Sequence, residues 1–210
     1  MAFLFCVMAQ LPENLVEKLQ TLKVAEPPRI LVISISNQTL TLFKDRKAET
    51  EWPISTARNG TGQKVDSYQT PLGLHRIKEK IGKDAPVGAI FEDRRFNGQI
   101  WIPLIFSTVT ANTNAVTSVH ESDKENLPND SDLITSRILW LEGLEPGYNS
   151  GYDQEGHLVD SYQRYIYIHG TNHEDEIGKP RSRGCVRMKN ASVISLFDFV
   201  QEGDLVWIQE

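Results

Sequence analysis

The sequence predicts a mainly β domain with little helix over roughly residues 29–210, preceded by an N-terminal segment and helix at 1–28. Short apolar runs separated by Gly, Asn, Asp and Pro recur along most of the chain, as expected of strands joined by turns. Apolar residues follow a helical spacing in only two short segments. The 210 residues are 40% hydrophobic and 24% charged, which is typical of a globular protein able to bury a core.

The first helix is expected at residues 11–24, where apolar side chains have helical spacing. Pro12 suits its first turn, and the prolines at 27–28 end it and mark the boundary of the domain. This helix is expected to pack on the domain as an appendage without chemistry. The apolar segment 1–9 lacks the basic region of a signal peptide, so it is either the remnant of an export signal or a buried or frayed N-terminal segment.

The β pattern begins at residue 29. Strands are expected at 30–35, 39–43 and 49–55, and the turn residues between them indicate a meander. A Gly-rich polar loop at 57–69, expected to be a mobile edge, leads into a strand over Thr70–Ile77.

The middle of the chain is less regular. Residues 81–98 are rich in Gly, Pro and charge and are predicted to be irregular, whereas 99–106 indicates a strand. The polar stretch 107–132 is interpreted as a flexible insertion or a solvated surface excursion. Residues 133–144 return to apolar side chains, which are expected to be buried around 138–141, and a loop follows over 145–157.

Residues 165–170 alternate with the period of a strand. Tyr165, Tyr167 and His169 share one face, so isoleucines on the other face would leave His169 on the wetter side. Gly170 would then permit a sharp change of direction.

The C-terminal half contains the second helix and the last strand. Asn190 is expected to cap the helix, whose apolar residues recur at positions i, i+3, i+4 and i+7, and Gly203 to end it. The final strand is expected at 205–208.

Charge and cysteine content exclude several classes of protein. The net charge of −6 argues against a nucleic-acid-binding surface. With only Cys6 and Cys185, a disulfide framework is not expected and a four-cysteine zinc site is excluded. No apolar run reaches eighteen residues, so no transmembrane helix is expected.

Cys185 lies sixteen residues after His169, and this pair is a candidate nucleophile and base. Nearby cations can lower a thiol pKa to roughly 3.5–7.5. The backbone N–H groups of Gly184 and Cys185 could stabilise an oxyanion. An uninterrupted basic run surrounds the cysteine and predicts a thiolate: Lys179, Arg181, Arg183, Arg187 and Lys189.

Other interpretations stay open. Cys185 could be a small buried apolar residue, His169 a strand-end histidine, and the basic run a solvated loop. A metal site could use His169, His173 and Cys185, with His120 or His157. The turn-like residues 170–172 argue against a helix that would bring His169 and His173 together, so no metal and no cofactor are expected.

Four stretches resemble the L,D-transpeptidase (YkuD) catalytic domain family: Thr70–Gly73, Ile138–Asn149, Ile168–Thr171 and Ser182–Met188. The resemblance covers roughly residues 29–210 and implies a β-sandwich or barrel-like domain with a cleft over the cysteine. It implies peptidoglycan cross-linking through a thioester. The partners would be stem peptides as acyl donor and amine acceptor, and the location would be the cell envelope or periplasm.

The resemblance also implies roles for individual residues. Cys185 would attack the L-centre carbonyl of a stem tetrapeptide, and His169 would act as base and acid. The carbonyl of Gly170 or a neighbouring group would orient the imidazole. Ser182 would support the turn, and Arg183, Gly184 and Cys185 would supply oxyanion N–H groups. Arg187 would bind a substrate carboxylate, and Tyr167 would line the cleft.

One position departs from the family pattern. Many members have a histidine where this chain has Arg183, so His169 is the sole nearby base in the motif. Three hypotheses follow: an L,D-transpeptidase, an L,D-carboxypeptidase that resolves the same thioester with water, or a silent peptidoglycan-binding module. The intact Cys185 and His169 argue against the third.

Overall fold

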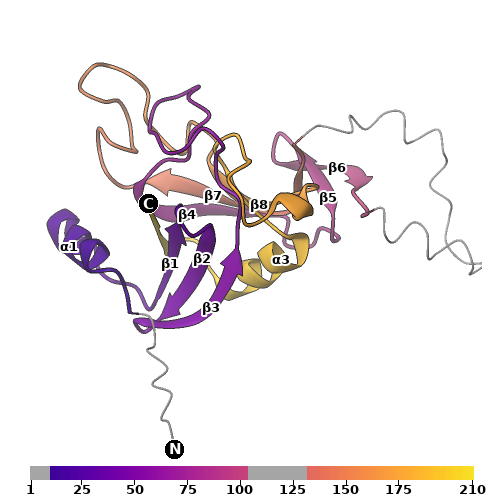
Figure 1. Ribbon diagram of the computed structural model, residues 1–210, viewed down its shortest axis with the longest axis horizontal. Coiled ribbons are helices and arrows are strands. Elements are labelled where there is room, and N and C mark those ends of the chain that lie inside the picture. Colours follow the sequence, from indigo (N-terminus) through magenta and orange to yellow (C-terminus); the bar gives the residue numbers. More distant parts are fainter. Residues whose placement is uncertain (1–9, 104–131) are drawn as a thin grey trace, which may run out of the picture.

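The structure is a computed structural model that describes residues 10–103 and 132–210. A mixed ten-stranded sheet has the order β3-β2-β1-β10-β4-β7-β5-β6, with β8 on β7 and β9 on β8 (Figure 1). The prediction of a mainly β fold with two short helices is confirmed. The strands are β1 Arg29–Ser34, β2 Thr39–Lys44, β3 Lys47–Pro53, β4 Gly73–Ile81, β5 Ala89–Glu92, β6 Arg95–Ile100, β7 Ile134–Gly143, β8 Tyr167–Gly170, β9 Val186–Met188 and β10 Leu205–Gln209; the helices are α1 Glu13–Leu22, the short 3-10 helix η3 Glu174–Glu176 and α3 Asn190–Phe199.

The first three strands form the predicted antiparallel meander. Its second turn is made by Asp45 and Arg46, with φ values of 48° and 65°. Two consecutive residues with positive φ are typical of hairpin turns whose twist matches that of the strands. β10 inserts between β1 and β4, so the C-terminus completes the sheet begun by the first strand.

The prediction that residues 81–98 are irregular is wrong. β5 and β6 form a hairpin there, turned by Asp93 and Arg94 with φ values of 45° and 64°. Its turn contains no glycine, so the commonest sequence signal of such a turn is missing. The strand expected at 99–106 ends at Ile100, residues 101–103 belong to no strand, and 104–106 lie outside the described residues, as do 107–131.

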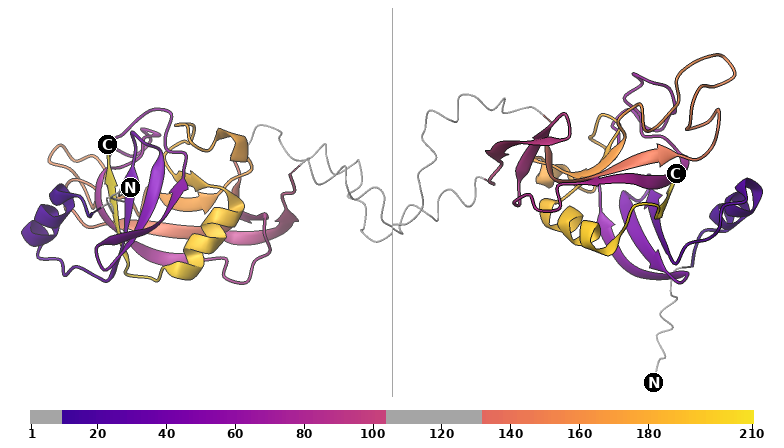
Figure 2. Two further views of the ribbon diagram at one scale, coloured as in Figure 1. Left: turned by 60° about the horizontal axis from the view of Figure 1, so that its bottom comes forward. Right: turned by 180° about the vertical axis from the view of Figure 1, so that it is seen from behind.

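The two helices cover different faces of the sheet (Figures 1 and 2). Leu31 and Ile33 of β1 face the main core, to which α3 contributes Val193, Leu196 and Phe197. The alternate residues Ile30 and Val32 face a second cluster that contains Leu15 and Leu19 of α1. The predicted packing of α1 on the domain is therefore confirmed, although Pro12 lies just before the helix.

The start of α3 differs from the prediction. Lys189 is the capping residue, and Asn190 is the first residue of the helix. The Asn190 side chain is buried, where its Oδ1 accepts from Thr135 Oγ1 at 2.6 Å and its Nδ2 donates to the Thr171 carbonyl at 3.0 Å. Asn190 therefore joins β7, α3 and the segment after β8. The helix ends at Phe199, before Gly203.

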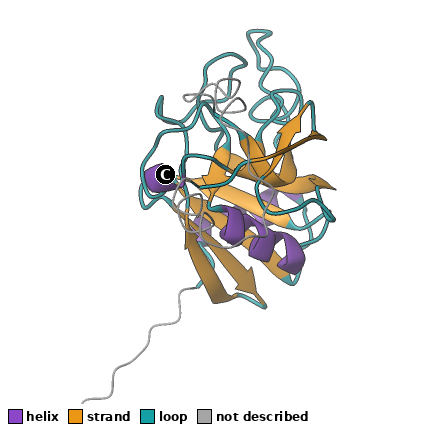
Figure 3. Cartoon of the chain, turned by 90° about the vertical axis from the view of Figure 1, so that its right-hand side faces the viewer, coloured by secondary structure: helices purple, strands orange, loops and turns teal. Residues whose placement is uncertain are grey.

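A third apolar cluster lies on the face of β7 opposite the main core. It includes Ile138 and Trp140 of β7 and Tyr167 of β8, with Cys185 packed against it. Figure 3 shows that most of the loop structure gathers at one end of the strands. Neither helix within 10–103 and 132–210 has the length and hydropathy needed to cross a membrane.

Candidate active site

The parallel pairing of β8 with β9 organises the site. Its register sets Ile168 opposite Val186 and His169 opposite Arg187. The first pair lies in the main core. Because side chains alternate between the faces of a strand, His169 and Arg187 lie together on the other face. The pairing of β8 with β9 thus places His169, the predicted base, beside Arg187 of the cysteine motif.

Cys185 comes directly before β9 and is half-buried. Its thiol donates to the Tyr165 carbonyl and accepts from the Tyr167 amide, both at 3.4 Å. Tyr167 and His169 are alternate residues of β8 and therefore share a face. The nucleophile lies next to the strand that carries the base, on the same side of the sheet.

His169 is held by its own strand. Its Nδ1 lies 2.7 Å from the Gly170 carbonyl, and because a carbonyl only accepts, this nitrogen carries the proton. Nε2 is then the nitrogen that can accept a proton. His169 is only 2% exposed, so the prediction of a wetter side for this residue is wrong. Burial lowers the pKa of His169, with Asp132 opposing and Arg187 reinforcing this effect.

The predicted low thiol pKa is also wrong in direction. Burial raises the pKa of Cys185 to about 11, the Tyr167 amide opposes this, and Asp132 adds to it. Two cations, Arg187 and Arg164, lower the value without overcoming burial. Arg183 acts elsewhere, since its guanidinium lies 4.9 Å from the centre of the Tyr68 ring. The free pair is therefore neutral thiol and neutral imidazole.

A small hydrogen-bond network holds the cysteine turn. Ser182 Oγ donates to the Cys185 carbonyl at 2.6 Å and accepts from the Gly184 amide at 3.2 Å. The Gly184 amide, assigned from the sequence to an oxyanion, thus already has a partner. Thr70 Oγ1 donates to the Gly184 carbonyl at 2.9 Å, which connects this turn to the segment before β4.

The two glycines of the motif are needed for different reasons. Gly184 has a φ of 130°, which side chains rarely adopt, and a Cβ there would meet nothing closer than 3.5 Å. Gly170 ends β8 without a positive φ, but a Cβ there would lie 2.6 Å from Asn190 Oδ1 and 2.7 Å from the Thr135 carbonyl oxygen. Gly170 is therefore required for space and not for the expected change of direction.

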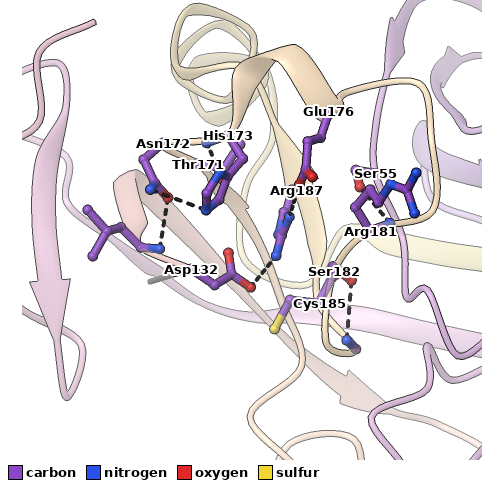
Figure 4. Close-up of polar contacts among 12 residues, drawn as sticks. Ser55, Asp132, Thr171, Asn172, His173, Glu176, Arg181, Ser182, Cys185 and Arg187 are labelled. Carbon is purple, nitrogen blue, oxygen red and sulfur yellow. Dashed lines mark hydrogen bonds and ion pairs between the residues drawn. The ribbon is translucent and has the colours of Figure 1, made fainter. Parts of the chain in front are cut away.

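Arg187 is buried between two carboxylates (Figure 4). It is 3% exposed, with Nη2 2.5 Å from Asp132 Oδ2 and Nη1 3.1 Å from Glu176 Oε2. A substrate carboxylate would have to compete with these partners. Asp132 is the last residue of the polar stretch 107–132, which was interpreted as an insertion. Neither Asp132 nor Arg164 was predicted as a site residue, because neither belongs to a recognisable motif.

Aromatic side chains form a wall beside the thiol. Trp140 stacks on Tyr162 with ring centres 4.0 Å apart and meets Tyr167 edge-on at 5.4 Å. Arg94, from the β5–β6 turn, lies 5.2 Å from the ring centres of both Trp140 and Tyr165. Tyr165 itself has a φ of 57° and lies outside β8, so the predicted alternation starts two residues later.

The histidines considered for a metal site are dispersed. His173 Nε2 lies 3.3 Å from Asn172 Nδ2, and His120 is outside the described residues. His157 lies with Asp153 and Glu155, whose potential ligand atoms are all within 4.8 Å of one another. The ammonium group of Lys64 is 3.1 Å from Glu155 and 4.0 Å from Asp153, so a cation already balances these carboxylates.

Comparisons with known proteins agree on one family. The model of the L,D-transpeptidase catalytic domain, YkuD, matches residues 28–208. The Bacillus subtilis (strain 168) protein YqjB, provisionally named an L,D-transpeptidase, is 40% identical over 71 residues, which are 33% of this chain and 40% of that protein. The similarly named YkuD of Bacillus licheniformis is 51% identical over 46 residues, 22% of this chain and 28% of the relative.

Two solved structures, both named L,D-transpeptidases, align with most of the chain. An L,D-transpeptidase from Mycobacterium smegmatis aligns with a TM-score of 0.48 and 14% identity, over 87% of this chain and 59% of the other. L,D-transpeptidase 3 from Mycobacterium tuberculosis, in complex with a faropenem-derived adduct, aligns with a TM-score of 0.47 and 17% identity, over 88% and 61%. The chain thus spans less than two thirds of the length of these relatives.

Proposed function

Because the chain belongs to the L,D-transpeptidase (YkuD) catalytic domain family, we propose that it is a cysteine-dependent L,D-transpeptidase of peptidoglycan. The observation that carries the proposal is the parallel register of β8 and β9, which places His169 and Arg187 side by side with Cys185 just before β9. The acyl donor would be a stem tetrapeptide and the acceptor an amine of a neighbouring stem. Such a substrate places the enzyme at the cell envelope.

In the acylation step, Cys185 Sγ attacks the carbonyl of the L-centre residue while its proton passes to His169 Nε2. A C–S bond forms, the peptide C–N bond breaks, and His169 returns the proton to the departing D-alanine amine. The lowered pKa of His169 and the raised pKa of Cys185 favour the neutral pair before substrate arrives. Proton transfer is therefore expected to accompany nucleophilic attack, and the alkylation of the free enzyme should be slow at neutral pH.

The developing oxyanion needs donors that have no other partner. Since the Gly184 amide donates to Ser182 Oγ, we assign the oxyanion to the backbone amides of Arg183 and Cys185. Ser182 then acts indirectly, because its two hydrogen bonds hold the turn in shape. Tyr167 lines the cleft as a neutral phenol, since burial raises its pKa to about 12.

The test is an assay with a disaccharide-tetrapeptide and a free D-amino acid, followed by mass spectrometry. Transfer gives an exchange product and releases D-alanine, whereas an L,D-carboxypeptidase gives the tripeptide alone. A silent binding module would retain the ligand without releasing D-alanine. Cys185→Ala should abolish release, and release at the wild-type rate in this variant would refute the thioester mechanism.

A further inference from the structure

The buried pair of Arg187 and Asp132 contains polar atoms that no described residue satisfies. Asp132 Oδ2 binds the guanidinium, but Asp132 Oδ1 is buried without a hydrogen-bond partner in the described part of the chain. Arg187 Nε is in the same condition. Unpaired buried polar atoms are costly, and a carboxylate oxygen more so than a neutral one. Such an atom beside a candidate nucleophile indicates a place where a ligand supplies the missing donor.

The position of Asp132 follows from its contacts. It binds Arg187, which is paired in register with His169 and follows Cys185 by two residues. Its negative charge acts on both members of the candidate pair, since it raises the pKa of His169 and that of Cys185. Figure 4 shows the Asp132 carboxylate paired with the Arg187 guanidinium, and the Cys185 side chain lies near this pair in the same view.

This carboxylate is unsuited to the donor half of the reaction. Its charge opposes formation of the Cys185 thiolate that attacks the donor peptide. The second half of the reaction brings the opposite charge. An amine acceptor arrives as an ammonium group and must approach the thioester on Cys185, and a carboxylate with a free oxygen attracts such a group.

We propose that Asp132 binds the ammonium group of the acyl acceptor through Oδ1, while Arg187 holds the carboxylate in place. This inference rests on the proposed transpeptidase function and assigns the acceptor side of the same site. Asp132 would then favour an amine over water as the group that resolves the thioester. It is a residue that determines specificity for transfer over hydrolysis.

The bound ammonium releases one proton to solvent, and the resulting amine attacks the thioester carbonyl. A C–N bond forms and the C–S bond breaks. His169 Nε2 takes the second proton from the nitrogen and passes it to the departing Cys185 thiolate, which restores the thiol. Asp132 holds the nitrogen and exchanges no electron pair with the substrate.

The chain offers a matched control. Glu176 is the second carboxylate on Arg187, at 3.1 Å from Nη1, and it is not among the groups that shift the pKa of His169 or of Cys185. Asp132→Asn removes a charge beside the thiol, and Glu176→Gln removes one from the same arginine. Both substitutions preserve the size of the side chain.

The experiment measures D-alanine release and the ratio of exchange product to tripeptide in each variant, with a D-amino acid as acceptor. Loss of one charge-assisted contact should lower this ratio roughly tenfold or more in Asp132→Asn. Glu176→Gln should keep the wild-type ratio. Hydroxylamine, which is uncharged at neutral pH, should resolve the thioester equally well in wild type and Asp132→Asn.

The outcomes separate the two proposals. The role of Asp132 would be overturned if Asp132→Asn kept the wild-type ratio of exchange product to tripeptide. It would also be overturned if the substitution slowed resolution of the thioester by the same factor with hydroxylamine and with the D-amino acid. Continued D-alanine release in that variant would show that the fold and the acylation step are intact. Absence of D-alanine release from the wild type would instead refute the proposed function and this inference with it.

Discussion

The Thr70 hydroxyl donates to the Gly184 carbonyl at 2.9 Å, across 114 residues of sequence. The same oxygen accepts from the Ala57 amide at 3.0 Å. Thr70 is fully buried, so one side chain satisfies two backbone groups that water cannot reach. The conformation of the cysteine turn thus depends on a threonine that precedes β4.

The first prediction concerns this contact. Thr70→Val keeps the shape of the side chain but leaves the Ala57 amide and the Gly184 carbonyl unpaired, at a cost of about 1–3 kcal/mol for each buried group. We expect a lower free energy of unfolding in urea titrations and slower D-alanine release. Thr70→Ser retains the hydroxyl and should restore most of both. Equal behaviour of the Val and Ser variants would contradict a role for the hydroxyl.

The second prediction concerns the thiol. With a pKa of about 11, Cys185 should be alkylated by iodoacetamide at a rate that rises roughly tenfold per pH unit from about pH 7 to about pH 10, without a plateau. Arg164 lowers this pKa, so Arg164→Gln should slow alkylation at fixed pH, whereas Arg164→Lys, which keeps the charge, should slow it less.

Arg183→Gln is the control for that experiment. Its guanidinium stacks on Tyr68 and is not among the groups that shift the thiol pKa, so alkylation should proceed as in the wild type. An alkylation rate that levels off near pH 7, or equal slowing in Arg183→Gln and Arg164→Gln, would favour the thiolate expected from the basic run.

The third prediction concerns Gly170. Its Cβ in Gly170→Ala would lie 2.7 Å from the Thr135 carbonyl oxygen, and a backbone atom of a central strand cannot move aside easily. Overpacking of this kind costs about 1–3 kcal/mol. The free energy of unfolding should fall by that amount, and the imidazole orientation set by the Gly170 carbonyl should be disturbed. A variant as stable and as active as the wild type would contradict the packing argument.

A structural feature can be predicted from the sequence when the residues that determine it lie close together along the chain. The meander, the buried apolar run at 138–141 and the Cys185–His169 pair depend on local alternation and spacing, and they were predictable. Asp132 and Arg164 reach the thiol through tertiary contacts that no local pattern encodes. The direction of the thiol pKa was missed for a related reason, because counting cations ignores burial, which dominates at this site.

The glycines illustrate the same limit. A glycine in the sequence indicates either a special backbone conformation or a lack of space. Only the structure distinguishes the two, with a positive φ at Gly184 and close neighbours at Gly170. The β5–β6 hairpin was missed because Asp93 and Arg94 adopt positive φ without a glycine.

The last prediction concerns the dependence of stability on pH, through His75 of β4. This residue is fully buried, with Nδ1 3.0 Å from the Gly73 carbonyl and Nε2 2.9 Å from Ser161 Oγ. Burial lowers its pKa from 6.5 to about 4, and Arg164 adds to this effect. Below about pH 6.5 the unfolded chain binds a proton that the folded chain refuses until about pH 4, so the free energy of unfolding falls as pH drops through that window.

The lowered pKa of His75 corresponds to a loss of about 3 kcal/mol in the free energy of unfolding between about pH 7 and about pH 4. His75→Gln removes this titration, so its urea-unfolding free energy should depend less on pH than that of the wild type, by up to this amount. Part of the slope should remain, because burial also lowers the pKa of His169. Identical slopes in wild type and His75→Gln would mean that His75 takes up its proton equally easily in the folded and unfolded chains.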